Sequence, residues 1–408
     1  MSIPTLHIIL LASLASLLVS TGRADQSREE VALFIFGDSI NDAGTNNYIN
    51  TTADFRANFP PYGKTFHNPT GRFSDGRLIA DFIAEFAKLP LIPPYLQMKD
   101  GEFMAGTNFA SGGAGALVDT YKGFVVNFKM QLKQLKQLRK EGKDQANRII
   151  KEGVYLISIG SNDYLMPLVY NPALFQSIST EDYVGMVIGN ITTVLKGMYK
   201  VGGRKFAMMG IGPLGCVPGM RLLTRNGSCS GAANKLAMLH NTALTSILAK
   251  LETRLHGFKY SYFDFYASGS EKIRHPSKYG FKEAENACCG SGPYKASPTC
   301  GGKRGVKEYS LCRHPEKFLF FDTYHPSERA NKQSAQLMWN GSLSHIADEL
   351  AKLHNIALIS ILTLWDFMNH DLSSRFAQNK ILKFIARDEQ CATRTLGLYL
   401  VAFWLDFG

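Results

Sequence analysis

Short apolar runs alternate along this chain of 408 residues with segments of helical periodicity, and this alternation limits the possible folds. Runs rich in β-branched and aromatic residues predict five strands, at 31–36, 107–110, 154–159, 205–211 and 259–265. Helical patterns lie between or after them, at 77–88, 125–141, 181–200, 232–255 and 326–339. Strands that alternate with helices form parallel sheets, so the sequence predicts a three-layer α/β/α sandwich with a mostly parallel five-stranded sheet.

A serine follows the first predicted strand. Ser39 lies in the run 34–42, which changes from apolar residues to small and polar ones. Ligand sites of parallel sheets lie at the carboxyl ends of the strands, which is where Ser39 is placed. A serine in this position is by itself more often a helix cap. The surrounding residues do not form the G-x-S-x-G turn of the larger α/β-hydrolases.

An aspartate and a histidine three residues apart, Asp322 and His325, lie far downstream of Ser39. On a turn, this spacing lets the carboxylate reach Nδ1–H of the imidazole, which leaves Nε2 to accept a proton from Ser39. Such a pair alone usually marks a surface turn. Together with a serine at a strand end, it predicts an activated serine nucleophile.

Two polar segments, 108–115 and 160–163, follow the second and third predicted strands. Acyl transfer places negative charge on a carbonyl oxygen, and hydrogen-bond donors stabilise that charge. The backbone N–H of Ser39, a glycine N–H of the first segment and the amide of Asn162 are candidate donors. The alternative for the first segment is a plain flexible loop, and the alternative for Asn162 is a helix cap. A phosphate-binding loop is a further alternative for the first segment, but the lysine that follows such a loop is missing from this sequence.

These residues, in this order, resemble the GDSL family of serine esterases and lipases, also named SGNH hydrolases. The likeness runs from about residue 31 to about residue 341. The secreted plant branch is indicated by Pro60-Pro61-Tyr62-Gly63 and by the segments 70–77, 212–216 and 287–290. One departure is conservative, because Ile40 stands where the family name has leucine.

The resemblance implies a flavodoxin-like fold and a catalytic set of Ser39, Asp322 and His325. It also implies an oxyanion hole built from Ser39, Gly112 and Asn162, with Gly112 chosen over its neighbour by comparison with the family's second motif. The expected activity is hydrolysis of small-molecule or lipid carboxylic esters through an acyl-enzyme, without a cofactor or metal. An acyltransferase with an alcohol acceptor and an inactive binding protein on the same fold remain alternatives.

Several features predict a secreted, extracellular protein. Residues 1–24 read as a signal peptide, with an apolar stretch at 8–19 and small residues near its end. That stretch is shorter than the ~20 residues of a membrane-spanning helix, so we expect no stable membrane anchor. Glycosylation sequons lie at Asn50, Asn190, Asn226 and Asn340.

Six cysteines cluster within one third of the chain: Cys216, Cys229, Cys288, Cys289, Cys300 and Cys312. An even set of this kind predicts disulfides in an oxidising compartment. Their connectivity stays open, except that the adjacent Cys288 and Cys289 are expected to have different partners. Zinc is the alternative, but no paired C-x-x-C spacing occurs. The surrounding segment 266–313 is predicted to be a long irregular excursion.

The net charge of +11 and the pI near 9.2 allow weak attraction to anionic surfaces. Solvated lysines on an ordinary amphipathic helix are the alternative, and no nucleic-acid module accompanies them. We expect one hydrolase domain over 25–343. Residues 344–408 form an atypical tail outside the family likeness, either an extra helical appendage or a mis-predicted coding end.

Overall fold

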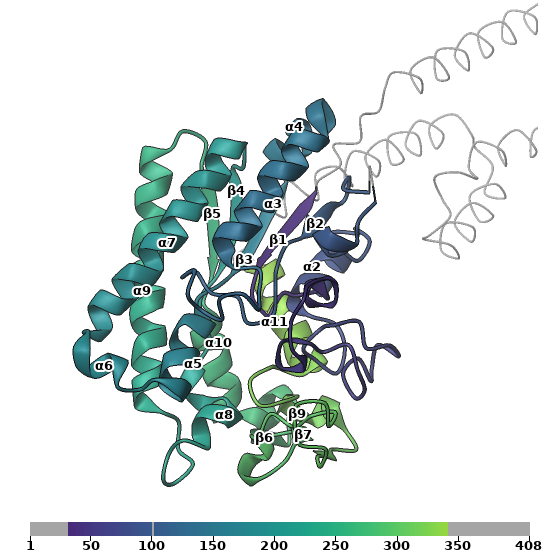
Figure 1. Ribbon diagram of the computed structural model, residues 1–408, viewed down its shortest axis with the longest axis vertical. Helices are drawn as coiled ribbons and strands as arrows, with labels where there is room; N and C mark the ends of the chain where they lie inside the picture. Colours follow the sequence, from purple (N-terminus) through teal and green to yellow (C-terminus); the bar gives the residue numbers. More distant parts are fainter. Residues whose placement is uncertain (1–31, 100–101, 342–408) are drawn as a thin grey trace, which may run out of the picture. The chain divides into compact units, whose positions relative to one another are not determined.

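The computed structural model describes residues 32–99 and 102–341 (Figure 1). The predicted signal peptide and C-terminal tail therefore lie outside the described residues. Five strands of the described region form one sheet in the order β2-β1-β3-β4-β5, and every pair in it is parallel. The strands are β1 (Leu33–Gly37), β2 (Gly106–Asn108), β3 (Val154–Ser158), β4 (Lys205–Met209) and β5 (Lys259–Phe263). The predicted sheet is confirmed, with strand ends shifted by one or two residues.

Residues along the first strand alternate between two hydrophobic cores. Phe34 and Phe36 pack with side chains of the long helices on one face of the sheet. Leu33 and Ile35 pack with buried residues of the helices on the other face. Because successive side chains of a strand point to opposite faces, a strand that is apolar throughout is buried on both sides. The three-layer sandwich follows from this pattern, and its predicted class is confirmed.

Helices cover both faces of the sheet (Figure 1). One core includes residues of α3 (Phe128–Glu141), α4 (Lys143–Glu152), α7 (Thr180–Val201) and α9 (Gly231–Arg254). The other includes residues of α2 (Ile79–Phe86) and α11 (Glu328–Asn340). The remaining α-helices of the described region are α5 (Ser161–Tyr170), α6 (Leu174–Ser177), α8 (Pro218–Arg221) and α10 (Phe265–Arg274). None of the described helices is both long enough and apolar enough to cross a bilayer.

Polar side chains fix where several of these helices begin. Asn127 accepts a hydrogen bond from Met130 N at the start of α3, and Ser179 accepts one from Asp182 N at the start of α7. Ser230 and Ser327 cap α9 and α11 in the same way. Each cap satisfies a backbone N–H that has no partner within its helix, and such a cap contributes about 1 kcal/mol.

The cysteine-rich segment is more regular than the sequence predicted. It begins with helix α10 and contains the short strands β6 (Glu283–Ala287), β7 (Cys289–Gly290) and β8 (Ser310–Leu311). Strand β6 pairs with β9 (Phe318–Phe320), and β7 pairs with β8. The prediction of an irregular excursion is therefore wrong for these parts.

Three disulfides join the six clustered cysteines within the described residues: Cys216–Cys229, Cys288–Cys312 and Cys289–Cys300. The predicted separate partners of Cys288 and Cys289 are confirmed. Cys288–Cys312 joins the residue before β7 to the residue after β8, and Cys289–Cys300 ties β7 to the loop between the two strands.

Candidate active site

Ser39 lies just beyond the carboxyl end of β1, where the backbone is tightly held. Gly37 has a φ of +134°, and a Cβ at this position would lie 2.0 Å from the carbonyl oxygen of Ser158 in β3. Only glycine allows this approach of the two strands. The side chain of Gln131 in α3 also clamps Gly37: its Oε1 accepts from Gly37 N at 2.9 Å and its Nε2 donates to Gly37 O at 2.8 Å. The backbone of Gly37, from which the turn with Ser39 begins, is therefore held in one position.

The structure brings Ser39, His325 and Asp322 into one hydrogen-bonded series. His325 Nε2 lies 2.7 Å from Ser39 Oγ, and His325 Nδ1 lies 2.7 Å from Asp322 Oδ1. The same Asp322 oxygen accepts the backbone N–H groups of Tyr324 at 3.0 Å and of His325 at 2.9 Å. The aspartate thus holds both the ring and the backbone of the histidine. An imidazole oriented in this way can take a proton from a hydroxyl group.

Asp322 is buried and stays ionised. Burial by itself raises the pKa of a carboxyl group. Here the charge of His325, the hydrogen bonds from His325 and from the backbone N–H of Tyr324, and the charge of Arg304 outweigh burial and lower the pKa of Asp322 to about 2. The negative charge opposite His325 is therefore present throughout the neutral range.

Asn162 lies in the first turn of α5, immediately after the carboxyl end of β3. Its Nδ2 donates to the carbonyl oxygen of Ala114 at 3.0 Å, and its side chain lines the pocket beside Ser39. An amide nitrogen carries two hydrogens, so one remains for a ligand. The neighbouring Asp163 is buried and accepts from Ala116 N and Leu117 N at 2.8 and 3.0 Å. These bonds hold the glycine-rich loop against α5.

Gly112 does not offer its N–H to the pocket, which corrects the sequence prediction. The Gly112 N–H donates to Asp42 Oδ2 at 2.7 Å, and the Gly112 carbonyl accepts from Asn46 Nδ2 at 2.9 Å. Gly113, one residue further, lines the pocket and has a φ of +83°. Its N–H has no hydrogen-bond partner among the residues that the structure describes. The hydrogen-bond partner of Gly112 lies seventy residues earlier in the chain, so the motif alone does not indicate that this N–H is occupied.

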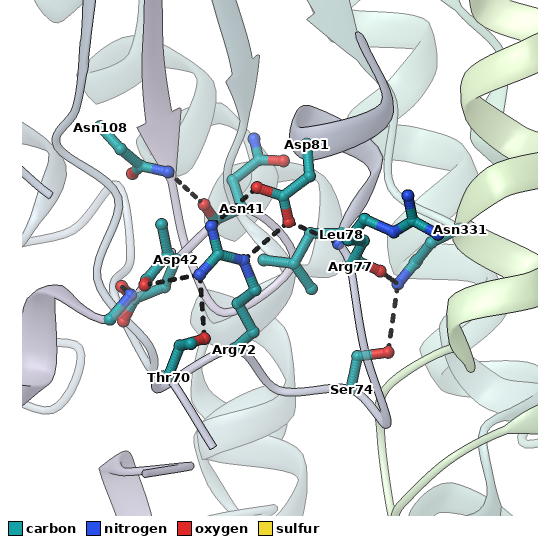
Figure 2. Close-up of polar contacts among 12 residues, drawn as sticks. Asn41, Asp42, Thr70, Arg72, Ser74, Arg77, Leu78, Asp81, Asn108 and Asn331 are labelled. Atoms are coloured by element: carbon teal, nitrogen blue, oxygen red, sulfur yellow. Dashed lines mark hydrogen bonds and ion pairs between the residues drawn. The ribbon is translucent and has the colours of Figure 1, made fainter. Parts of the chain in front are cut away.

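A buried polar network lies under the turn after β1 (Figure 2). Arg72 forms a two-bond ion pair with Asp81 of α2, at 2.7 and 2.8 Å, and donates to the carbonyl oxygen of Ala43 at 3.2 Å. Asn108, at the end of β2, donates to the carbonyl oxygen of Asn41 at 2.7 Å. Paired guanidinium and carboxylate groups satisfy each other when they are buried. The network joins β2, α2 and the Ser39 turn beneath the pocket.

The pocket over Ser39 has a mainly apolar wall with polar groups at the reacting end. Its apolar side chains include Phe55, Phe73, Tyr121, Leu165, Val169, Ile211, Leu214, Val217, Phe265 and Tyr324. The ring of Phe73 lies 4.9 Å from the imidazole of His325, measured between centroids. No group of three or more His, Cys, Asp or Glu side chains in the described part of the chain is arranged to hold a metal ion.

Comparison with known proteins agrees with this fold. The family model for GDSL-like lipases and acylhydrolases matches residues 33–338. The chain belongs to the GDSL lipase and acylhydrolase family. GDSL esterase/lipase 5 of Arabidopsis thaliana is 49% identical over 328 residues, which cover 78% of this chain and 84% of the relative. GDSL esterase/lipase 1 of the same plant is 50% identical over 321 residues, covering 76% and 86%.

A third relative bears on the question of activity. A protein of Arabidopsis thaliana named inactive GDSL esterase/lipase-like protein 25 is 35% identical over 308 residues, covering 75% of this chain and 70% of the relative. The GDSL family therefore includes a protein named as inactive. The relatives at 49% and 50% identity are named esterase/lipases, which is consistent with a carboxylic ester hydrolase.

Two side chains of this GDSL-family site were missed by sequence reasoning. Tyr62 donates to Asp322 Oδ2 at 2.7 Å, and Arg304 donates to Tyr62 Oη at 2.8 Å. The run Pro60-Pro61-Tyr62-Gly63 is part of the family likeness, which by itself indicates no role for Tyr62. Tyr62 precedes Asp322 by 260 residues, so no local spacing indicates the contact.

Proposed function

We propose that this chain is a secreted serine esterase or lipase that cleaves carboxylic esters through an acyl-enzyme on Ser39. His325 takes the proton of Ser39 Oγ as the oxygen attacks the ester carbonyl, and then gives that proton to the leaving alcohol. Water, deprotonated by the same imidazole, attacks the acyl-enzyme, and the imidazole returns that proton to Ser39 Oγ as the acid leaves. Asp322 orients the ring and stabilises its protonated form. The single observation that supports this proposal is the 2.7 Å approach of His325 Nε2 to Ser39 Oγ.

The oxyanion of each tetrahedral intermediate needs donors that are already in place. We assign this role to the N–H groups of Ser39 and Gly113 and to the side-chain amide of Asn162. Neither backbone N–H has a partner in the described region, and the side chains of both Ser39 and Asn162 line the pocket. Donors of this kind act on charge that develops only in the transition state, so they raise kcat.

The apolar wall of the pocket fits the acyl chain of a lipid or another aliphatic ester. A water-excluding wall favours apolar acyl groups by roughly 25 cal/mol for each Å² of surface that they bury. Secretion is supported by the three disulfides, which form in oxidising compartments. We further propose that the hydrolase domain spans 25–343, after a signal peptide at 1–24, and that 344–408 lie outside it.

Replacement of Ser39 tests this function. Ser39→Ala should abolish hydrolysis of a panel of p-nitrophenyl esters while the melting temperature stays close to that of wild type. An organophosphate should label wild type at Ser39 and leave the variant unlabelled. Ser177→Ala is the control, because that serine donates only to the carbonyl oxygen of Leu174 on an exposed helix. A correctly folded Ser39→Ala protein that keeps most of the activity would overturn the mechanism.

The two alternatives give different results in the same assay. An inactive binding protein would neither hydrolyse the esters nor react with the organophosphate. An acyltransferase would form the same acyl-enzyme but would transfer it to an added alcohol in preference to water. Product analysis in the presence of glycerol or a long-chain alcohol separates transfer from hydrolysis.

A further inference from the structure

The second carboxylate oxygen of Asp322 belongs to a buried chain of hydrogen bonds that the proposed mechanism does not use. Oδ1 faces His325, whereas Oδ2 accepts the phenolic O–H of Tyr62 at 2.7 Å. The Tyr62 oxygen in turn accepts from Arg304 Nη1 at 2.8 Å. Tyr62 is buried, with 1% of its surface exposed, so solvent does not compete for its hydroxyl. A continuous path therefore runs from Arg304 through Tyr62 to Asp322.

Arg304 is held in one position by the backbone around it. Its Nε donates to the carbonyl oxygen of Ala53 at 3.1 Å, and its Nη2 donates to that of Arg56 at 2.7 Å. Its guanidinium also lies over the rings of Phe59 and Tyr62, at 5.5 and 5.3 Å from their centroids. Each of its three nitrogens has a partner, and the residue also lines the pocket that contains Ser39. Its one side-chain partner is the hydroxyl that contacts Asp322.

Two disulfides fix the loop that carries Arg304. The loop lies between Cys300 and Cys312, which are bonded to Cys289 and Cys288. All four cysteines share a small core with Tyr62 and with Phe321, the residue before Asp322. The disulfide-linked segment, the loop of Tyr62 and the turn of His325 therefore pack as one unit.

We propose that Tyr62 and Arg304 are positioning residues for the Asp322–His325 pair, and this inference rests on the proposed hydrolase function. The Tyr62 hydroxyl fixes the rotation of the carboxylate, so that Oδ1 stays directed at His325 Nδ1. Arg304 polarises that hydroxyl and supplies a positive charge one side chain away. A guanidinium in direct contact with Asp322 would compete with the protonated imidazole. The tyrosine between them lets the charge act at a longer distance.

The two residues should affect the protonation of the site as well as its geometry. Without the Tyr62 hydroxyl, the carboxylate would hold the proton of the imidazolium more strongly. Without Arg304, one positive charge that opposes protonation of the imidazole would be lost. Both changes favour the protonated histidine, so the acidic limb of the kcat/KM profile should move to higher pH.

The test compares Tyr62→Phe, Arg304→Met and the double variant with wild type. Tyr62→Phe keeps the ring and should lower kcat by about tenfold, with little change in KM, as expected for one charged hydrogen bond. The acidic limb of the kcat/KM profile should move to higher pH by roughly half a unit. In the Tyr62→Phe background, Arg304→Met should add little to the loss of kcat, because the arginine positions the carboxylate through the missing hydroxyl, whereas its charge should still move the acidic limb.

Two matched controls lose similar bonds far from the pocket. Tyr155→Phe removes a buried hydroxyl that donates to the carbonyl oxygen of Ile150, and Arg204→Met removes bonds to the carbonyl oxygens of Tyr199 and Gly203. Both controls should lower the melting temperature and leave the pH profile unchanged. If Tyr62→Phe lowers the melting temperature like Tyr155→Phe without moving the acidic limb, the role is structural and the inference is wrong. Full additivity of the two losses of kcat in the double variant would remove Arg304 from the proposal.

A measurement without substrate separates this inference from the proposed function. The proton shared by His325 Nδ1 and Asp322 gives a downfield proton resonance in NMR, and no turnover is needed to observe it. Its position should shift in Tyr62→Phe and stay constant in Tyr155→Phe. If wild type does not hydrolyse the esters, or hydrolyses them without needing Ser39, the proposed function is wrong. An unshifted resonance in Tyr62→Phe would refute the positioning role alone.

Discussion

Asn162 supplies the one side-chain amide among the assigned oxyanion donors, so its contribution can be measured separately. Asn162→Ala should lower kcat by roughly 10²–10³-fold, the usual effect of losing one oxyanion donor. KM should change less, because the donor acts on charge that develops in the transition state. Steady-state kinetics on one short-chain ester gives both constants.

A second replacement at the same position separates lost donation from lost packing. Asn162→Asp keeps the shape of the side chain but places a negative charge beside the developing oxyanion. Its kcat should fall below that of Asn162→Ala. If both variants change KM and leave kcat unaltered, Asn162 is a substrate-positioning or structural residue and not an oxyanion donor.

Asp38, the residue before Ser39, gives the folded protein a specific pH dependence. Oδ1 accepts from Ile40 N at 3.0 Å, and the buried Oδ2 has no partner among the described residues. Burial raises the pKa of Asp38 from 3.8 to about 7, although the Ile40 bond and the charge of His325 lower it. The folded protein therefore keeps a proton that the unfolded chain has released. The contribution of this group to stability is complete below about pH 4 and is lost as the pH rises through about 7.

Asp38→Asn should remove this loss, because the amide cannot ionise. Relative to wild type, the free energy of unfolding of the variant should rise between about pH 4.5 and pH 8, by on the order of 2 kcal/mol. Urea unfolding at the two pH values measures the difference. The control is Asp119→Asn, whose side chain is 86% exposed and whose replacement should give the same small change at both pH values. Equal effects of Asp38→Asn at the two pH values would contradict the prediction.

The candidate site could be predicted from sequence where strand ends and short motifs mark its residues, as they do for Ser39, Asn162 and the Asp322–His325 pair. Asp322 and His325 are three residues apart, and the structure places them in contact. Whether Gly112 or Gly113 can act as an oxyanion donor depends on Asp42. Its carboxylate accepts the N–H of Gly112 and leaves the N–H of Gly113 without a partner among the described residues. The contact between Tyr62 and Asp322 likewise joins distant segments. Such long-range choices are made by packing, which a single sequence does not display.

At the scale of elements, strands and long helices could be predicted because their apolar residues have a clear period. The helix predicted at 181–200 is observed as Thr180–Val201, and the one predicted at 232–255 as Gly231–Arg254. Helix α5 was missed because Pro167 lies inside it and is usually a helix breaker. Helix α10 was missed because it contains glycine and serines, although Asp264 provides a capping signal at its start. Short helices are fixed by tertiary contacts more than by their own periodicity.

At the scale of the whole molecule, the strand order places the loops of the site together. Strands β2, β1 and β3 are neighbours, so the loops after them, which carry Gly113, Ser39 and Asn162, meet at one edge of the sheet. The turn of Asp322 and His325 reaches the same edge between β9 and α11. The parallel arrangement was predictable from the sequence, and the shared edge follows from it. The disulfide-linked segment then adds Arg304 to this edge from outside the sheet.

The last prediction concerns residues 345–408, which lie beyond the family match at 33–338. All the assigned site residues and all three disulfides come from the described region, which ends with α11. A chain that ends at Ser344 should therefore keep the wild-type kcat/KM, and its free energy of unfolding should change by less than about 1 kcal/mol. A chain that ends at Lys332 is the control. It loses the buried Ala335 and Met338 of α11, which pack with Leu33 and Ile35, and should lose several kcal/mol of stability. If the chain that ends at Ser344 unfolds as readily as this control, the C-terminal residues belong to the hydrolase domain and the proposed boundary is wrong.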